Sequence, residues 1–420
     1  MNTLLWFRNN LRLIDNEPLT EACSRSSQLQ PVLFIPEDFS LWGASRKRFW
    51  IQSVQNFQQD LEKHGSKLLL LNGNPVRQLQ EILETGQFTH LIFENAVAWN
   101  EVQQETEITK WCKPKGITCL GFESGGLFRQ MELPFSLEQL PAVFTQFRHK
   151  VEAGCRVASP LPAPASIPGF SGTPPLESVL LPEEESKLHP RSVLPFEGGE
   201  TAAWERLNHY FGADKHLSRY KETRNGLLGS DYSSKFSPWL ALGCISARSV
   251  VAEIKAYEKR NGANDSTYWL FFELLWREYF RWIALQQGRK IFLPGGIQGK
   301  PPSHYRNPKR FEAWCQGITG EPFVDANMQE LLHTGFMSNR GRQNVASFLV
   351  HDLGLDWRLG AGWFERNLID YDPASNWGNW NYVAGIGNDP REGRRFNIRR
   401  QADMYDPKGE YVDFWIGSTI

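Results

Sequence analysis

Residues 3–7 read TLLWF, and they are the first of five short apolar runs within the first 130 residues of the 420-residue chain. The later runs are PVLFI at 31–35, KLLLL at 67–71, HLIF at 90–93 and ITCL at 117–120. Polar segments with helix-like patterning separate these runs. Short apolar strands that alternate with helices predict a parallel sheet covered on both faces. Because such crossovers are right-handed, we expect a doubly wound α/β domain over residues 1–130.

None of the five runs is followed by a GxGxxG motif, so a Rossmann-type dinucleotide site is not expected in this domain. Proline then becomes frequent between residues 158 and 195, where the chain includes SPLPAPASIPGFSGTPPLES at 159–178. Proline removes backbone donors and fixes φ, which suppresses helix and sheet alike. We therefore predict an extended, proline-rich connector between domains, at 131–199.

After residue 200 the apolar residues recur with helical spacing. Seven helical segments are expected, at 200–211, 247–261, 266–287, 308–316, 325–335, 340–353 and 358–368. The connections between them are rich in Gly, Pro and Asn, which favour turns. Residues 200–420 are thus predicted to form a mostly α-helical domain.

The bulk composition is that of an ordinary soluble globular protein, with 41% apolar residues, 22% charged residues and a net charge of −1. No run approaches the ~18 apolar residues of a membrane span, and the first residues do not resemble a signal peptide. The six cysteines show no CxxC spacing, so neither a disulfide framework nor a metal site is expected. These features favour a cytoplasmic protein without a membrane partner.

The segment DYDPASNWGNWNY at 370–382 combines four aromatic residues with two aspartates and three asparagines. Buried amides and carboxylates are costly unless paired, and a surface loop does not normally expose so many large rings. A planar ligand with a polar edge, such as a flavin or nucleobase, satisfies both requirements. The alternative is a polar-aromatic turn that is hydrogen-bonded to its own backbone.

Two further blocks have features of an anion site or a pocket wall. The block YKETRNGLLGSDYSSKFS at 220–237 places serines around a lysine at the start of a helix, a pattern that suits an anion site or a plain serine N-cap. In WLFFELLWREYFRW at 269–282, Glu273, Trp276 and Arg277 share one face of a nearly all-apolar helix. The two charges either face a cavity or form an internal i,i+4 ion pair.

Arginine is frequent in the last two blocks. TGFMSNRGRQ at 334–343 contains two arginines beside Asn339 and Gln343, and REGRRFNIRR at 391–400 contains five arginines and one glutamate. Arginine is suited to phosphate recognition, and a cluster beside an aromatic site suits a nucleic-acid backbone. The alternative for both blocks is a solvated charged face.

Assembled in order, these blocks resemble the cryptochrome/photolyase family, and within it the cryptochrome-DASH branch. The resemblance covers nearly the whole chain and is carried by six colinear motifs: WFRNNLRLIDN (6–16), YSSKFSPWLALG (232–243), ELLWREYFR (273–281), TGFMSNRGRQNVASFL (334–349), DYDPASNWGNWNYVAGIGNDPRE (370–392) and FNIRRQADMYDPKGEYV (396–412). Relatives usually continue through at least one more segment, whereas this sequence ends at Ile420.

The resemblance implies a folded-back FAD bound by the helical domain. Asn376 is expected to face flavin N5 and Asp372 flavin N3, with Asp370 at the ribityl or C4 side. The full implied set of FAD-binding residues is Tyr220, Ser233, Ser234, Lys235, Phe236, Ser237, Arg277, Asn339, Arg342, Asp370, Asp372 and Asn376. An antenna of 5,10-methenyltetrahydrofolate is implied at Asn100 and Glu101.

The resemblance also implies an electron-transfer chain and a lesion pocket. The chain is Trp380 nearest the flavin, then Trp357, then Trp314 at the surface. The pocket residues are Glu273, Trp276, Tyr382, Gln343, Arg340 and Arg394. Tyr382 and Gln343 stand where enzymes that repair duplex DNA have tryptophan and methionine, a departure that resembles the DASH branch.

The implied activity is light-driven repair of cyclobutane pyrimidine dimers by a monomeric photolyase-type enzyme. The expected partner is single-stranded DNA, with RNA as an alternative. Two rival functions share the flavin: a blue-light photoreceptor that signals without repair, and a dark flavin oxidoreductase. The second is disfavoured because no nicotinamide site is visible in the sequence.

Overall fold

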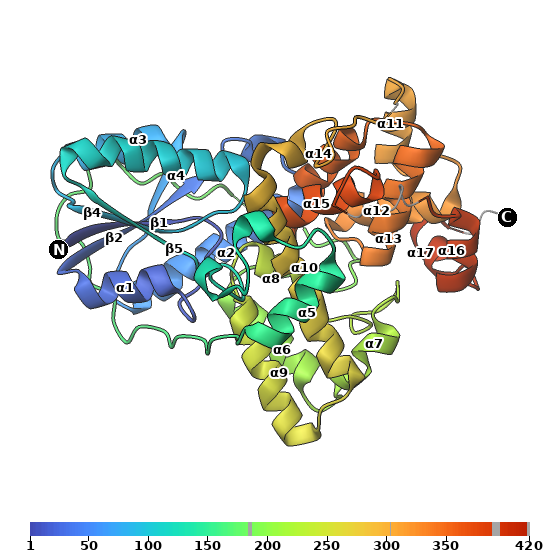
Figure 1. The fold of residues 1–420 in the computed structure, drawn as a ribbon, viewed down its shortest axis with the longest axis horizontal. Coiled ribbons are helices and arrows are strands. Elements are labelled where there is room, and N and C mark those ends of the chain that lie inside the picture. The colour runs from blue at the N-terminus through green and yellow to red at the C-terminus, as the bar shows by residue number, and fades with distance from the viewer. Residues whose placement is uncertain (184–186, 303, 389–394, 418–420) are drawn as a thin grey trace.

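The computed structural model describes residues 1–183, 187–302, 304–388 and 395–417, and it consists of an α/β domain beside a larger helical domain (Figure 1). Five parallel strands form one sheet in the order β3-β2-β1-β4-β5. Their bounds are β1 (Asn2–Phe7), β2 (Gln28–Ile35), β3 (Leu69–Asn72), β4 (His90–Glu94) and β5 (Thr118–Phe122). Each of the five apolar runs therefore became a strand, as predicted.

Helices cover both faces of this sheet, as the doubly wound arrangement requires. Along β1, Leu5 and Phe7 pack in one core with α1 (Glu17–Arg25) and α2 (Ala44–Lys63). The alternating residues of the same strand pack in a second core with α3 (Pro75–Glu84) and α4 (Trp99–Cys112). Because successive side chains of a strand point to opposite faces, the continuous apolar runs fill both cores.

The helical domain contains the seven expected helices and three further main helices. Its main helices are α6 (Glu200–Phe211), α9 (Ala247–Asn261), α10 (Asp265–Gln287), α11 (Pro308–Cys315), α12 (Pro322–Thr334), α13 (Asn339–Ser347), α14 (Trp357–Asn367), α15 (Pro373–Val383), α16 (Ile398–Tyr405) and α17 (Glu410–Ile416). Two short helices, α7 (Tyr220–Thr223) and α8 (Ser237–Ala241), precede α9. A π-helical segment, Phe348–Asp352, continues α13. The unexpected helices are α15, which contains most of the polar-aromatic segment, and the C-terminal α16 and α17.

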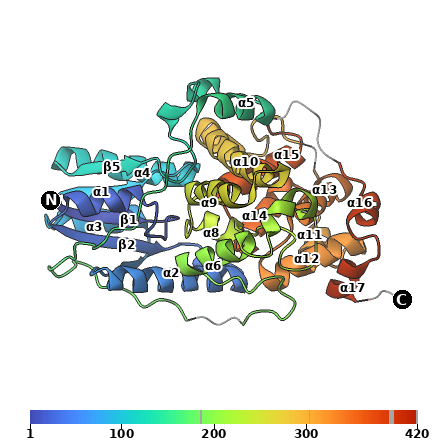
Figure 2. The same cartoon turned by 90° about the horizontal axis from the view of Figure 1, so that it is seen from below.

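The connector differs from the prediction in its first part. Residues 144–154 form α5 (Phe144–Gly154), which buries Phe144, Phe147 and Val151. These residues recur with helical spacing and lie outside the proline-rich window, so the local sequence supports a helix. From residue 155 to 199 the described residues form neither helix nor strand, and this stretch runs along the surface (Figure 2).

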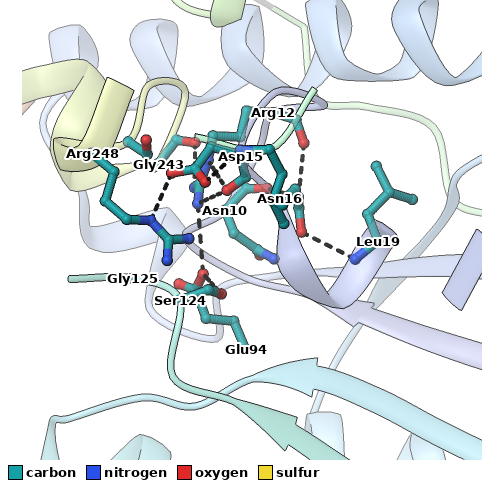
Figure 3. A network of polar contacts seen from close by, with 12 residues as sticks. Asn10, Arg12, Asp15, Asn16, Leu19, Glu94, Ser124, Gly125, Gly243 and Arg248 are labelled. Atoms are coloured by element: carbon teal, nitrogen blue, oxygen red, sulfur yellow. Dashed lines mark hydrogen bonds and ion pairs between the residues drawn. The ribbon is translucent and has the colours of Figure 1, made fainter. Parts of the chain in front are cut away.

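The loop that follows β1 joins the two domains through buried polar contacts (Figure 3). Arg12 Nη1 donates to the carbonyl of Gly243, 3.0 Å away, and Arg248 Nε pairs with Asp15 Oδ2 at 3.0 Å. The Arg248 and Asp15 side chains are 6% and 0% exposed. A Cβ at Gly243, where φ is +66°, would lie 2.0 Å from the carbonyl oxygen of Asn9, so only glycine permits this approach. This contact fixes the orientation of the α/β domain on the helical domain.

In the part of the chain that the structure describes, no helix is both long enough and apolar enough to cross a membrane.

Candidate functional site

The polar-aromatic segment forms a capped helix, and the interpretation as a turn is wrong. Asp372 is the N-cap of α15, where its Oδ1 accepts from the backbone N–H of Ser375 at 2.7 Å, and proline follows at the first helical position. One turn apart on this helix, Asn376 and Trp380 lie on the same face. Asn376 Nδ2 donates to the carbonyl of Ala361 on α14, 3.1 Å away. The segment's amides are thus tied to neighbouring backbone.

Arg342 and Asp370 form a close ion pair between α13 and the loop before α15. Arg342 Nη2 lies 2.8 Å from Asp370 Oδ2, and Arg342 Nε donates to the carbonyl of Met337. Within the described residues, Asp370 Oδ1 and the Tyr232 hydroxyl are buried without a hydrogen-bond partner. Buried polar atoms normally have partners. An unpaired acceptor and an unpaired hydroxyl suit a polar ligand edge, so these residues fit a flavin.

Arg206, a residue that the sequence did not single out, forms hydrogen bonds with the serine loop, residues 230–237. This buried α6 side chain donates to the carbonyls of Ser230, Ser233 and Ser234, each at 3.0 Å. Ser234 is buried, Ser233 is half-buried and Ser237 is exposed at the start of α8. Arg206 lies on an amphipathic helix with no distinctive spacing, so the sequence carried no signal for this role.

Lys235 and Phe236, both in the predicted FAD-binding set, are engaged within the protein. Lys235 Nζ donates to the carbonyls of Gly229 and Ser230 at 3.2 and 2.9 Å, and its side chain lies over the Tyr232 ring. Burial holds the pKa of the Lys235 ammonium well below its usual value. Phe236 and Tyr220 belong to the hydrophobic core. Lys235 therefore shapes the loop from inside and does not present its charge at the loop surface.

We predict that Arg206→Ala lowers the amount of FAD retained by the folded protein. Removing the guanidinium leaves the carbonyls of Ser233 and Ser234 without this donor and that of Ser230 with Lys235 alone, so the loop loses much of its support. The ratio of flavin absorbance to protein absorbance after gel filtration measures retention. Arg260→Ala, at an exposed position on α9, is the control. Equal flavin content in the Arg206 variant and wild type would contradict this role.

Glu273 and Arg277 on α10 do not pair with each other in the contacts that the structure gives them. Glu273 Oε1 accepts from Arg224 Nη1 at 2.5 Å, whereas Arg277 donates to the carbonyls of Gly125 and Leu240. The interpretation as an internal i,i+4 pair is therefore wrong. Burial raises the pKa of Glu273, against the opposing effect of the Arg224 charge. Burial also lowers the pKa of Arg277.

Trp276 already has an aromatic neighbour on one ring face. Its ring is stacked on Phe144 of α5, with centroids 3.7 Å apart and planes 13° from parallel. Phe280, one turn further along α10, lies 5.7 Å away. Phe144 was not expected here because its segment was predicted to be extended. A base can therefore stack on Trp276 only where Phe144 does not cover the ring.

A polar network links Glu273 with α13. Arg340 Nη1 donates to Gln343 Oε1 at 2.9 Å, and its Nη2 donates to Asn225 Oδ1 at 3.2 Å. Asn225 is the next residue after Arg224, the ion-pair partner of Glu273, so these two adjacent residues connect Glu273 with Arg340. Arg340 also lies 4.4 Å from the Tyr405 ring centre. Arg340 is therefore engaged within the protein and positions Gln343.

The other predicted residues of this region have simpler surroundings. Asn339 is exposed at the first position of α13, and Tyr382 is half-buried in the last turn of α15. Arg394 lies outside the described residues. Its neighbour Arg395 is 68% exposed and pairs with Asp352 at 2.6 Å.

The last tryptophan of the predicted series does not lie where it was expected. Trp314 is fully buried, so its assignment as the surface end of the chain is wrong. Its ring contacts that of Trp380 directly, at 6.3 Å between centroids. Trp357 is also buried, and it packs edge-on against Trp377 at 5.6 Å. Trp377 lies in the same segment as Trp380 but was not included in the predicted series.

The predicted antenna pair is divided between two environments. Asn100 is exposed, whereas Glu101 lines a cavity of about 50 Å³ between the domains, together with Arg8, Arg277 and Asp372. Burial raises the pKa of Glu101, and the Arg8 charge opposes this shift. A second cavity of about 540 Å³ lies at the carboxyl ends of β4 and β5, beside α4 and α10. Only Glu101 of the pair faces the interior.

Known proteins match this chain over almost its entire length. The family model described as DNA photolyase matches residues 3–165, and the one described as FAD binding domain of DNA photolyase matches residues 269–419. Cryptochrome DASH of Gloeobacter violaceus is 45% identical, over 98% of this chain and 85% of the relative. A Synechocystis cryptochrome structure has a TM-score of 0.94 at 45% identity, covering 99% of this chain and 88% of that chain.

A bacterial class III photolyase from Agrobacterium tumefaciens is more distant, with a TM-score of 0.87 at 28% identity, over 99% of this chain and 86% of that chain. Both the expected fold and the expected family are confirmed. The chain belongs to the cryptochrome/photolyase family, in its cryptochrome-DASH branch, and its helical domain is an FAD-binding domain.

Proposed function

We propose that this protein uses blue light to repair cyclobutane pyrimidine dimers, preferentially in single-stranded DNA. The observation that carries the proposal is the half-buried Glu273 carboxyl, which is paired with Arg224 and connected through Asn225 to Arg340 and Gln343. A bound, reduced FAD supplies light-driven electron transfer to the dimer and back, with no net redox change.

The protein's own residues orient the reactants. Arg342 and Asp370 would hold the polar edge of the flavin through the Asp370 oxygen that lacks a partner among the described residues, and Asp372 and Asn376 lie on the adjoining helix. Burial raises the pKa of Glu273 against the opposing charge of Arg224, and in its protonated form this carboxyl can donate a hydrogen bond to a dimer carbonyl. Trp276 offers the uncovered part of its ring to a base.

The substrate preference follows from the energy needed to expose the lesion. Unpairing and unstacking a base in a duplex costs a few kcal/mol, and a single strand has already met much of that cost. Stacking contacts have to offset it, but Trp276 is partly covered by Phe144. The polar Gln343 and the phenol of Tyr382 add less stacking surface than methionine and tryptophan.

We further propose that Glu101 contributes to a 5,10-methenyltetrahydrofolate antenna site.

The decisive experiment is a repair assay under blue light, with matched single- and double-stranded dimer substrates and fully reduced flavin. We expect single-stranded repair to be faster by about tenfold or more. Unpairing and unstacking the lesion in a duplex costs a few kcal/mol, and about 1.4 kcal/mol corresponds to a factor of ten in rate. Glu273→Gln keeps a donor but loses the charge that pairs with Arg224, whereas Glu312→Gln, exposed on α11, is the control. Equal rates on both substrates would reject the preference. Absence of repair on either would favour a photoreceptor without lyase activity.

A further inference from the structure

Two histidines and an aspartate meet at a place that the proposed repair chemistry does not use. His209 lies near the end of α6, His216 begins the short helix His216–Arg219, and Asp231 lies in the loop before α8. His209 Nε2 is 3.1 Å from Asp231 Oδ1, and His216 Nε2 is 3.9 Å from Asp231 Oδ2. The three potential ligand atoms all lie within 4.8 Å of one another.

These separations suit a tetrahedral metal ion. Zinc binds imidazole nitrogens and carboxylate oxygens at about 2.0–2.2 Å, which places neighbouring ligand atoms roughly 3.3–3.6 Å apart. The observed 3.1 and 3.9 Å, one to each carboxylate oxygen, lie on either side of this range, and side-chain rotations can bring both imidazoles within reach of an ion on Asp231 Oδ2. Asp214 Oδ2, 3.8 Å from His216 Nε2, is available as a fourth ligand.

The surroundings hold these side chains in place, as partners outside the ligand shell do at metal sites. The Tyr210 ring stacks on His216 with centroids 5.6 Å apart. Ser230 Oγ donates to Asp231 Oδ2 at 2.6 Å. Lys215 adopts a left-handed conformation, with φ of +50°, that turns the chain back just before His216. Such a conformation is uncommon for a residue other than glycine, and it is maintained by its surroundings.

One neighbouring charge opposes a cation and restricts where it can bind. Arg206 Nη1 donates to Asp231 Oδ1 at 2.7 Å. That oxygen is therefore already shared between Arg206 and His209, whereas Asp231 Oδ2, which accepts from Ser230 Oγ, is the oxygen paired with His216. An ion on the Oδ2 side keeps the carboxylate between itself and the guanidinium.

We propose that His209, His216 and Asp231 bind a divalent transition-metal ion of the Zn²⁺ type, with Asp214 or water as the fourth ligand. The sequence did not indicate this site because its ligands come from three segments with no motif spacing. The ion ties α6, the turn before α7 and the serine loop together. Arg206 links Asp231 with the carbonyls of Ser233 and Ser234, so a metal bound to Asp231 stabilises the serine loop through Arg206.

The test is a titration of the full-length, flavin-loaded protein with Zn²⁺ alone, monitored by calorimetry and by the melting temperature. We expect saturable binding of one ion and a rise in the melting temperature, because a ligand that binds only the folded state stabilises it. His209→Ala and His216→Ala should each weaken binding by about tenfold or more. His209 is 49% exposed, so its variant is expected to fold even if the His216 variant does not.

A second histidine pair provides the matched control. The rings of His189 and His333 stack with centroids 4.8 Å apart, well separated in sequence from the proposed ligands. His333→Ala should leave Zn²⁺ binding unchanged. Absence of saturable binding in the wild type would overturn the proposal. An equal loss of affinity in the His333 and His209 variants would do so as well, whatever the outcome of the repair assay.

Discussion

Arg342→Ala is expected to destabilise the protein by about 3 kcal/mol and to release most of its FAD. Asp370 is almost fully buried, and one of its carboxylate oxygens already lacks a hydrogen-bond partner among the described residues. Removing Arg342 leaves the other oxygen unpaired too, so a buried charge loses its compensation. The value is at the low end of the usual range because the Arg342 side chain is 24% exposed.

A double-mutant cycle separates this charge effect from simple loss of packing. Asp370→Asn removes the buried charge, so the double variant Arg342→Ala/Asp370→Asn should be more stable than Arg342→Ala alone. Urea unfolding monitored by circular dichroism gives the stabilities, and flavin absorbance gives the retained cofactor. Arg342→Lys keeps a positive charge but loses the second donor that reaches Met337. Additive effects of the two single substitutions would show that the pair does not act as a unit.

The fold was largely readable from the sequence because its signals are local. Each apolar run was long enough for one strand and too short for a helix, and the two cores of the sheet use alternate residues of β1. The helix α15 was missed because its interior is rich in Asn and Trp, although Asp372 and Pro373 are an N-cap and a first-turn proline. Likewise, Phe144, Phe147 and Val151 carried the helical spacing of α5.

The candidate site was only partly readable, because its partners come from distant segments. Glu273 was singled out from the sequence of its helix, but its ion-pair partner Arg224 is 49 residues earlier in the chain. The three carbonyl contacts of Arg206 depend on how α6 packs against the serine loop, which no spacing reveals. For the same reason Trp314 was placed at the surface, although it packs in the interior against Trp380.

A buried carboxyl that interacts with the charge of Lys235 makes the stability of this protein depend on pH. Glu330 on α12 is fully buried, and its Oε2 accepts from the Tyr411 hydroxyl of α17 at 2.7 Å. Burial raises the pKa of Glu330 from 4.5 to about 7, against the lowering effect of the Tyr411 hydrogen bond and of Lys235. The folded state therefore binds a proton that the unfolded state releases between pH 4.5 and about 7.

Since the folded-state pKa is the higher one, the contribution of this group is favourable below pH 4.5 and is lost as the pH rises through about 7. At pH 8 the ionised carboxylate costs about 3 kcal/mol relative to acid conditions. Glu330→Gln removes the charge and keeps an oxygen for Tyr411. We therefore expect this variant to be more stable than wild type at pH 8, with the advantage shrinking towards pH 5.

Urea unfolding of both proteins at equal flavin content, at pH 5, 6, 7 and 8, measures this difference. The exposed substitution Glu312→Gln should leave the difference from wild type nearly constant over the same range. If the Glu330→Gln and wild-type curves run parallel from pH 5 to 8, Glu330 does not take up a proton in the folded state. A variant that is less stable than wild type at every pH would instead show that nearby positive charges, those of Lys235 and Arg342, offset the cost of burying the ionised carboxylate.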